Sequence, residues 1–224
     1  MKTVLLAKDR PGLTQAIEYL RSVCSDVRVH VGVPGQPFPA HEFESSVDLT
    51  VSYMSAWIVP ESALRMTELA AVNFHPGPPE YPGTGCTNFA IYDGAKEYGV
   101  TAHLMEPSVD TGKILLVSRF PVDPNDSVHS LTLKCYDELK RVFPRVIDGV
   151  IGRAQLPISP ETWPRKPFTR RQFLDLCKVT PDMGEDEIRR RVRATTFPGY
   201  PGAYIELAGL RFEHDGNLSN LIEP

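Results

Sequence analysis

An asparagine and a histidine stand two residues apart at the end of the apolar run 71–74. Residues i and i+2 of an extended strand face the same side, so Asn73 and His75 are expected to point into one space. Histidine suits proton transfer near neutral pH, and an asparagine amide can stabilise an oxyanion. Most Asn-x-His pairs are nevertheless structural, so this pair needs support from other residues.

The segment that follows is unusually stiff. Residues 73–85 hold four prolines and three glycines in thirteen positions. Proline fixes its own φ angle, so such a loop suits side chains that must be held in place. Open α/β sheets bind ligands just outside the carboxyl ends of their strands. The loop therefore predicts a site at the end of this strand.

A carboxylate that could join the site is Asp110, which opens the sequence Asp-Thr-Gly at 110–112. Near His75 it would orient the imidazole. The alternative is an aspartate that merely begins a turn before glycine. Asp-Thr-Gly is also the signature of aspartic proteases, whose chemistry needs two carboxylates sharing a proton. The chain has one such sequence, which disfavours a protease.

Other kinds of site leave no pattern in the sequence. Neither a dinucleotide-binding GxGxxG nor a phosphate-binding GxxxxGK[ST] occurs. No CxxC pair is present, so the four cysteines are expected to be reduced thiols in the cytoplasm. The remaining histidines show no ligand spacing, so no metal is expected; they are His30, His41, His103, His129 and His214.

Strands and helices alternate over the first 150 residues, judged by periods of 2 and 3.6 in the apolar positions. Strands are expected at 3–7, 27–33, 47–53, 71–74, 99–105 and 114–122, and helices at 13–23, 62–69, 88–96 and 127–150. Ser127 is the expected N-cap of the last helix, and its buried candidates are Leu131, Leu133, Leu139, Val142, Val146 and Ile147. The alternation predicts an α/β fold with a Rossmann-like, doubly wound, mostly parallel sheet.

The C-terminal part follows another pattern. Residues 157–167 carry four prolines and read as an extended connector. Helices are expected at 169–177 and 185–194, and a hairpin from 204–207 and 210–213. Residues 1–155 are therefore expected to form a catalytic core, and 156–224 a small helical and hairpin extension packed on it. The charged run 185–193 is expected to be a solvated helix face.

Composition limits the partners. The 24 Lys and Arg against 28 Asp and Glu give a net charge of −4, which argues against binding nucleic acid mainly by charge. No segment approaches the ~20 apolar residues of a membrane helix. The apolar start of the chain stops at Lys8, too early for a signal peptide. A cytoplasmic protein without membrane or nucleic-acid partners is expected.

Six short segments together resemble the formyltransferases that use 10-formyltetrahydrofolate. They are Ile-Val-Pro at 58–60, Asn-Phe-His-Pro at 73–76, Tyr-Pro-Gly at 81–83, Gly-Val-Thr at 99–101, Asp-Thr-Gly-Lys-Ile at 110–114, and residues 193–203. The resemblance spans about 48–207. It implies the formyltransferase fold, catalytic roles for Asn73, His75 and Asp110, and a pterin pocket between 52–58 and 103–110. The pocket residues would be Ser52, Tyr53, Trp57, Ile58, His103, Met105 and Val109.

Two of these segments are most similar to sugar N-formyltransferases. They are His-Pro-Gly-Pro-Pro-Glu-Tyr at 75–81 and Arg-Ala-Thr-Thr-Phe-Pro-Gly-Tyr at 193–200. The similarity implies a nucleotide-linked amino-dideoxysugar acceptor, destined for O-antigen or a related glycan. Implied substrate contacts are Pro76, Gly77, Tyr81 and Phe197, with Lys8, Arg10 and Arg193 as diphosphate candidates or solvated surface. A homodimer is expected, since this is the commonest oligomer.

Other activities remain open within the resemblance. The amine acceptor would be glycinamide ribonucleotide or methionyl-tRNA in related enzymes, and water would replace the amine in a formyltetrahydrofolate hydrolase. A non-catalytic folate- or nucleotide-binding module is a further alternative. In a transferase, Asn73 and His75 would stabilise the oxyanion, His75 would accept the amine proton, and Asp110 would orient the imidazole or relay protons through water.

Overall fold

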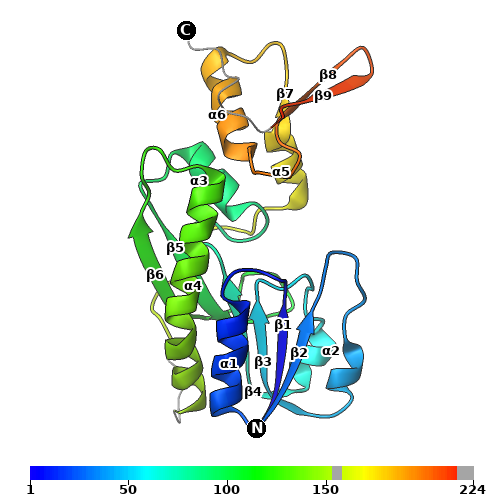
Figure 1. The fold of residues 1–224 in the computed structure, drawn as a ribbon, viewed down its shortest axis with the longest axis vertical. Helices are drawn as coiled ribbons and strands as arrows, with labels where there is room; N and C mark the ends of the chain where they lie inside the picture. The colour runs from blue at the N-terminus through cyan, green and yellow to red at the C-terminus, as the bar shows by residue number, and fades with distance from the viewer. Residues whose placement is uncertain (153–157, 216–224) are drawn as a thin grey trace. The chain divides into compact units, whose positions relative to one another are not determined.

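The computed structural model describes residues 1–152 and 158–215 (Figure 1). Its main sheet has six strands in the order β2-β1-β3-β4-β5-β6. The strands are β1 (Lys2–Ala7), β2 (Asp26–Val31), β3 (Val47–Tyr53), β4 (Thr67–His75), β5 (Glu97–Leu104) and β6 (Ile114–Pro121). The helices of the first 151 residues are α1 (Leu13–Val23), the short 3-10 helix η1 (Ala40–Phe43), α2 (Glu61–Arg65), α3 (Cys86–Asp93) and α4 (Val128–Ile151).

The pairing of the strands confirms the predicted mostly parallel sheet. β1 pairs in parallel with both β2 and β3, and β3 pairs in parallel with β4. β5 runs antiparallel to β4, so the direction of the sheet reverses at this pair. Because β1, β3 and β4 are parallel, their carboxyl ends share one edge of the sheet.

Both faces of this sheet are covered. On one face, Val4 and Leu6 of β1 pack with Phe43 of η1 and Ala63 of α2. On the other, the ring of Phe143 in α4 lies 5.6 Å from Tyr53 and 4.6 Å from Phe74. Helices on both faces are the defining feature of a doubly wound fold, which is therefore confirmed.

The N-terminus of α4 is capped as expected. The backbone N–H of Ser130 donates to the Ser127 hydroxyl (3.1 Å), and the N–H of Ser127 donates to the Ser130 hydroxyl (2.9 Å). The prediction that Leu133 is buried was wrong, because its side chain is 42% exposed. It lies two residues from Leu131, and such a step turns a side chain to the opposite side of a helix.

The chain divides into two compact units that differ from a simple division along the sequence. The first comprises Met1–Pro82, Gly99–Arg119 and Cys135–Pro167, and the second comprises Gly83–Tyr98, Phe120–Lys134 and Phe168–Pro224. The division at residue 155 stays a prediction. Residues 156–157 and 216–224 of the predicted extension, and Pro157 of the predicted connector, lie outside the described residues.

The C-terminal elements belong to the second unit. They are α5 (Arg170–Cys177), β7 (Lys178–Val179), α6 (Glu185–Thr195), β8 (Tyr204–Leu207) and β9 (Leu210–Glu213), with the three strands forming a small sheet. The expected hairpin is confirmed as the antiparallel pair β8–β9. In residues 1–152 and 158–215 no helix has the length and apolar character that crossing a membrane requires.

Two local predictions need correction. Residues 67–69 are strand and not helix, because Thr67 pairs with Val47 in the sheet. The charged face of α6 is also not simply solvated. Arg193 donates to the carbonyls of Pro124 (2.7 Å) and Asp126 (2.9 Å), so its guanidinium ties the helix to a neighbouring segment.

Candidate active site

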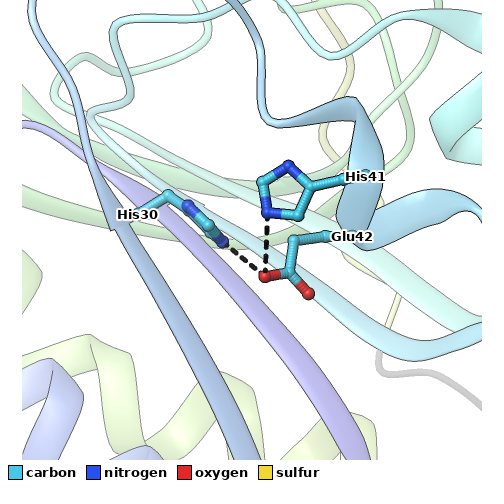
Figure 2. Close-up of side chains that lie close together, drawn as sticks. All are labelled: His30, His41 and Glu42. Carbon is cyan, nitrogen blue, oxygen red and sulfur yellow. Dashed lines mark hydrogen bonds and ion pairs between the residues drawn. The ribbon is translucent and has the colours of Figure 1, made fainter.

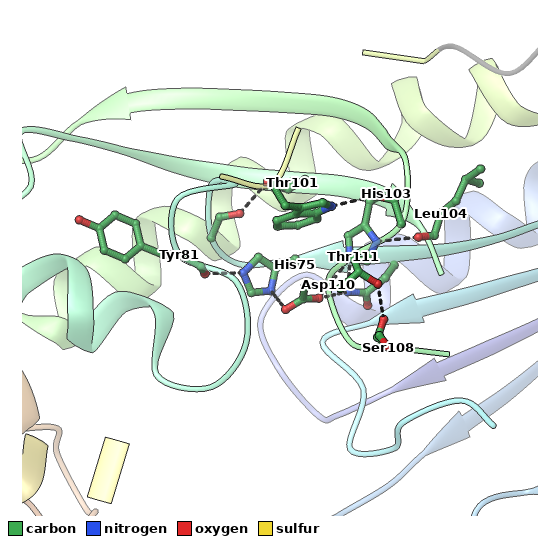
Figure 3. Close-up of polar contacts among 12 residues, drawn as sticks. His75, Tyr81, Thr101, His103, Leu104, Ser108, Asp110 and Thr111 are labelled. Atoms are coloured by element: carbon green, nitrogen blue, oxygen red, sulfur yellow. Dashed lines mark hydrogen bonds and ion pairs between the residues drawn. The ribbon is translucent and has the colours of Figure 1, made fainter. Parts of the chain in front are cut away.

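The pairing of β4 with β5 sets two polar residue pairs side by side. Asn73 lies opposite His103, and His75 lies opposite Thr101. Directly opposed residues of an antiparallel pair have side chains in contact on one face. The spacing of Asn73 and His75 in the sequence thus places both on the face that also carries His103. Both histidines are buried, as is Thr101 (Figure 3).

Asp110 lies between the two imidazoles (Figure 3). Its Oδ2 is 3.2 Å from Nδ1 of His75, and its Oδ1 is 3.2 Å from Nε2 of His103. The carboxyl group is 4% exposed, and the residue has a left-handed φ of 48°. That conformation is uncommon for a residue other than glycine and is often found at functional sites.

The turn that carries Asp110 depends on Gly112. A Cβ atom at position 112 would lie 1.8 Å from the main-chain oxygen of Leu104, so only glycine allows this close approach to β5. The hydroxyl of Thr111 closes the turn by donating to the carbonyl of Ser108 (2.9 Å). The Asp-Thr-Gly sequence therefore works as a tight turn that delivers one carboxylate to the histidines.

Main-chain carbonyls fix the far nitrogen of each imidazole. Nε2 of His75 is 2.9 Å from the carbonyl oxygen of Tyr81, and Nδ1 of His103 is 2.8 Å from that of Leu104. A carbonyl only accepts hydrogen bonds, so each of these nitrogens carries a hydrogen. In a neutral imidazole the other nitrogen then carries a lone pair and no hydrogen. In each of the two rings here, that nitrogen faces Asp110.

These contacts require one additional proton in the cluster. A lone pair facing a carboxylate oxygen at 3.2 Å is repulsive unless a proton lies between them. Nδ2 of Asn73 also donates to Nε2 of His103 (3.0 Å). A proton shared between Asp110 and an imidazole relieves this repulsion. Such a pair can both accept and return a proton.

The amide of Asn73 has one weak contact. Its Nδ2 lies 3.4 Å from Oδ1 of Asp110, much longer than its 3.0 Å contact with His103. A hydrogen bond of this length contributes little, so its hydrogen can be redirected to another acceptor at low cost. Asn73 is also only partly buried, which leaves its amide within reach of a ligand.

Trp163 completes this cluster, although the sequence predicted only a connector there. Its ring meets His103 edge to face at 5.1 Å and His75 at 6.2 Å, and its Nε1 donates to the carbonyl of Gly112 (2.8 Å). A pocket of about 650 Å³ is lined by residues 111–114 and 158–167, including Lys113, Arg165 and Lys166. The sequence signal that could have indicated this role is the presence of a tryptophan within the proline-rich stretch.

The proline-rich loop is tied to that same stretch through Arg119. Its guanidinium donates to both oxygens of Glu80 (3.0 Å each) and to Glu161 (2.6 Å). The hydrogen bond with Glu80 holds the pKa of Arg119 above its usual range. Glu80 directly precedes Tyr81, whose carbonyl fixes His75. Arg119 therefore joins the segment that sets the His75 tautomer to the segment that carries Trp163.

The predicted pterin-pocket residues fall into two groups. Ser52 and Tyr53 are buried, and Tyr53 is a core residue whose phenol pKa is raised by burial. Ile58 and Val109, by contrast, are exposed apolar side chains. Trp57 donates from Nε1 to the carbonyl of Gln36 (2.8 Å).

The two segments of that predicted pocket meet. Trp57 and Met105, one from each segment, pack against the same buried cluster that contains Val4 and Val59. An apolar surface with adjacent polar groups is typical of small-molecule sites. The assignment of these residues to a pterin pocket stays a prediction. His103, the remaining predicted pocket residue, is instead bonded to Asn73 and Asp110.

The predicted substrate residues are distributed over both units. In the first unit, the Gly77 carbonyl accepts a hydrogen bond from the Thr101 hydroxyl (2.8 Å), and the neighbouring Pro76 is partly buried. Lys8 and Arg10 follow β1 in the same unit, where Lys8 is partly buried and Arg10 is exposed. In the second, the Phe197 ring lies 5.2 Å from that of His129. Arg193, also there, is bound to main-chain carbonyls, a role the sequence did not indicate.

Fold and cluster together define a class of α/β protein in which histidine, aspartate and asparagine meet beside the end of a central strand. The family model described as formyl transferase matches residues 40–147. The match covers slightly less than half of the chain, and it confirms the predicted resemblance to formyltransferases.

The sequence relatives include two kinds of formyltransferase. The chain is 29% identical over 172 residues to a GDP-perosamine N-formyltransferase of Brucella melitensis, covering 75% of this chain and 63% of that protein. It is 30% identical over 171 residues to a methionyl-tRNA formyltransferase of Azobacteroides pseudotrichonymphae, covering 72% and 51%. The chain thus spans roughly half to two thirds of these relatives.

Solved structures share the fold across almost the whole chain. A sugar N-formyltransferase from Shewanella sp. aligns with a TM-score of 0.75 at 22% identity, covering 96% of each chain. An N-formyltransferase from Helicobacter canadensis, in complex with folinic acid and dTDP-3-aminofucose, aligns with a TM-score of 0.70 at 18% identity, covering 93% of this chain and 85% of that one. The formyltransferase fold is confirmed.

Proposed function

We propose that this protein transfers the formyl group of 10-formyltetrahydrofolate to the amine of a nucleotide-linked amino-dideoxysugar. The observation that carries the proposal is Asp110 held between the imidazoles of His75 and His103. Formyl transfer to an amine requires a group that takes the amine proton and a donor for the developing oxyanion. His75 and Asn73 supply these two functions in one cluster.

Each residue has a distinct task in this proposal. The acceptor amine attacks the formyl carbon carried on N10 of the folate. Collapse of the tetrahedral intermediate breaks the bond from that carbon to N10, and tetrahydrofolate leaves with the proton that the amine gave up. The Asn73 amide gives up its 3.4 Å contact with Asp110 and donates to the formyl oxygen as negative charge develops there. His75 handles the amine proton, and Asp110 orients its imidazole and shares that proton. Trp57, Ile58, Met105 and Val109 are proposed to hold the pterin.

An anionic acceptor is supported by the pocket beside Asp110. Lys113, Arg165 and Lys166 line it, and basic side chains near a pocket favour phosphate groups. Two similar proteins are named for sugar substrates, a GDP-perosamine N-formyltransferase and an enzyme solved with dTDP-3-aminofucose. The O-antigen destination, the cytoplasmic location and a homodimer remain predictions.

The test is a panel of acceptors offered together with 10-formyltetrahydrofolate. It contains nucleotide-linked 3-amino and 4-amino sugars, glycinamide ribonucleotide and methionyl-tRNA, and mass spectrometry detects the added formyl group. We expect formylation of at least one amino sugar. Formylation of only another acceptor, hydrolysis of the donor without transfer, or binding without reaction would each contradict the proposal and select one of its alternatives.

A pair of histidine variants tests the cluster itself. His75→Asn is expected to lower turnover about 10²–10⁴-fold, because it removes the group that takes the amine proton. His129→Asn is the matched control in the second unit, where the His129 ring meets that of Phe197. Near-native turnover in His75→Asn would overturn the assignment of His75.

A further inference from the structure

A second group of side chains with ligating atoms comes from β2 and η1 (Figure 2). Nε2 of His30 is 2.9 Å from Oε1 of Glu42, and Nε2 of His41 is 3.5 Å from the same oxygen. The three ligating atoms lie within 4.8 Å of one another. The prediction that these histidines form no cluster was wrong, because the chain turns back between residues 31 and 40 and brings η1 beside β2.

We propose that His30, His41 and Glu42 bind one divalent transition-metal ion, with zinc as the expected ion. Two imidazole nitrogens and one carboxylate oxygen are a ligand set that zinc uses when a fourth position stays open to water. Magnesium and calcium prefer oxygen ligands throughout, so they fit this set poorly. The site is separate from the proposed reaction and assigns the ion no part in it.

The distances suit such an ion. Zinc bonds of 2.0–2.2 Å in a tetrahedral arrangement put neighbouring ligand atoms about 3.4 Å apart. The observed separations of 2.9 Å and 3.5 Å lie on either side of this value. Both imidazole nitrogens already approach one carboxylate oxygen, so an ion would replace the hydrogens between them after small side-chain shifts.

The exposed fractions of the three side chains differ in a way that suits a bound ion. The side chains of Glu42 and His30 are 11% and 23% exposed, so little water competes for them. The side chain of His41 is 66% exposed, which gives an ion a path of entry and leaves room for a water ligand. Lys2 steadies the same turn by donating from Nζ to the main-chain carbonyl of Glu42 (2.9 Å).

The ion would close a loop that supports Trp57. His30 stands before the segment 32–39, and His41 and Glu42 stand directly after it. The carbonyl of Gln36 in this segment accepts from Trp57 Nε1, and a Cβ at Gly32 would lie 2.2 Å from the Trp57 ring. Bridging both ends of the loop restricts the chain when unfolded and favours the folded loop.

Titration calorimetry with zinc on tag-free, chelator-stripped protein tests the proposal. We expect one ion per chain, and at a free zinc concentration a hundred times the Kd a rise in unfolding temperature of about 5–10 °C. His30→Gln and His41→Gln are each expected to weaken binding at least tenfold, since even residues that only support a ligand cost about ten- to hundredfold.

Two features keep the result unambiguous. His41 is exposed, so His41→Gln should leave the zinc-free unfolding temperature unchanged, and its loss of binding cannot reflect misfolding. His129→Gln is the matched control and should bind zinc normally. Absence of saturable binding would overturn the proposal. So would binding that His30→Gln and His41→Gln leave unchanged, which would place the ion elsewhere, for instance at His75, His103 and Asp110.

Discussion

At the scale of single residues, the position of one proton separates this cluster from an ordinary polar contact. Asp110 approaches two imidazoles whose far nitrogens are both occupied by main-chain carbonyls. If both rings were neutral, neither could donate to the carboxyl group, so these contacts imply a proton shared between Asp110 and the imidazoles. The charge of Asp110 and its exchangeable hydrogen therefore both matter.

Replacing Asp110 with asparagine tests this requirement. The amide retains the size of the side chain but cannot share a proton in the same way. We expect turnover to fall on the order of 10²-fold or more with little change in acceptor affinity, because the loss belongs to the reacting step. Steady-state kinetics with the identified acceptor measures both quantities. Lost affinity with retained turnover would make Asp110 a binding residue.

At the scale of elements, one arginine side chain joins the loop 73–85 to the stretch 158–167. Arg119 binds Glu80 on one and Glu161 on the other. Exposed ion pairs contribute little on average, but a planar guanidinium that bridges two segments also fixes their geometry. The expected role of Arg119 is positioning, since its guanidinium binds Glu80 and Glu161 of the two segments that flank the cluster.

Arg119→Gln is expected to lower turnover about tenfold while the chain stays folded, because the Tyr81 carbonyl would hold His75 less firmly. A merely structural role would not change the pH profile of kcat, whereas a loosened His75 should shift it. Arg141→Gln is the matched control, since Arg141 pairs with Glu138 at an exposed site on α4. Equal effects in the two variants would exclude a positioning role for Arg119.

The start of α4 depends on a second buried carboxylate, Asp126. Burial alone would raise its pKa, but hydrogen bonds from Lys134 and Ser130 outweigh this, and the pKa lies below the usual 3.8. A lowered folded-state pKa contributes stability that is complete above the unfolded value and is lost as the pH falls through the folded one.

Asp126→Asn should therefore destabilise the protein by about 1–2 kcal/mol at pH 7, through weakened hydrogen bonds to Lys134 and Ser130. The difference from the native chain should shrink towards pH 3, where the native carboxyl group is itself becoming protonated. Urea unfolding at several pH values measures this. Asp137→Asn, at an exposed pair with Lys140, is the control expected to show no such dependence. A pH-independent difference for Asp126→Asn would contradict the assignment.

At the scale of the whole molecule, the charge balance bears on the acceptor. Methionyl-tRNA formyltransferases are among the relatives, yet this chain has a net charge of −4. Binding of nucleic acid draws mainly on neutralised phosphates. We expect no saturable binding of methionyl-tRNA at about 150 mM salt, measured by filter retention. Saturable binding that weakens steeply with salt would favour the tRNA acceptor.

Sequence reasoning recovered the local and periodic features and missed those made by distant contacts. The period of a strand placed Asn73 and His75 on one face, the Asp-Thr-Gly sequence indicated Asp110, and the resemblance implied a catalytic role for all three. The link of His103 to Asn73 follows from an antiparallel register, which no pattern in the sequence specifies. Trp163 stands 88 positions after His75, and the cluster at Glu42 arises from a turn of the chain. Contacts of this kind depend on topology.

The two carbonyls that fix the imidazoles also bear on how the site can change during evolution. Each belongs to the main chain, so replacing the side chain of Tyr81 or Leu104 leaves the carbonyl itself in place. Substitutions that alter the path of the backbone would, by contrast, move the carbonyl itself. The cluster is therefore expected to tolerate changes of side chain at Leu104, and to be disturbed by changes at the prolines and glycines that shape the loop between residues 76 and 85.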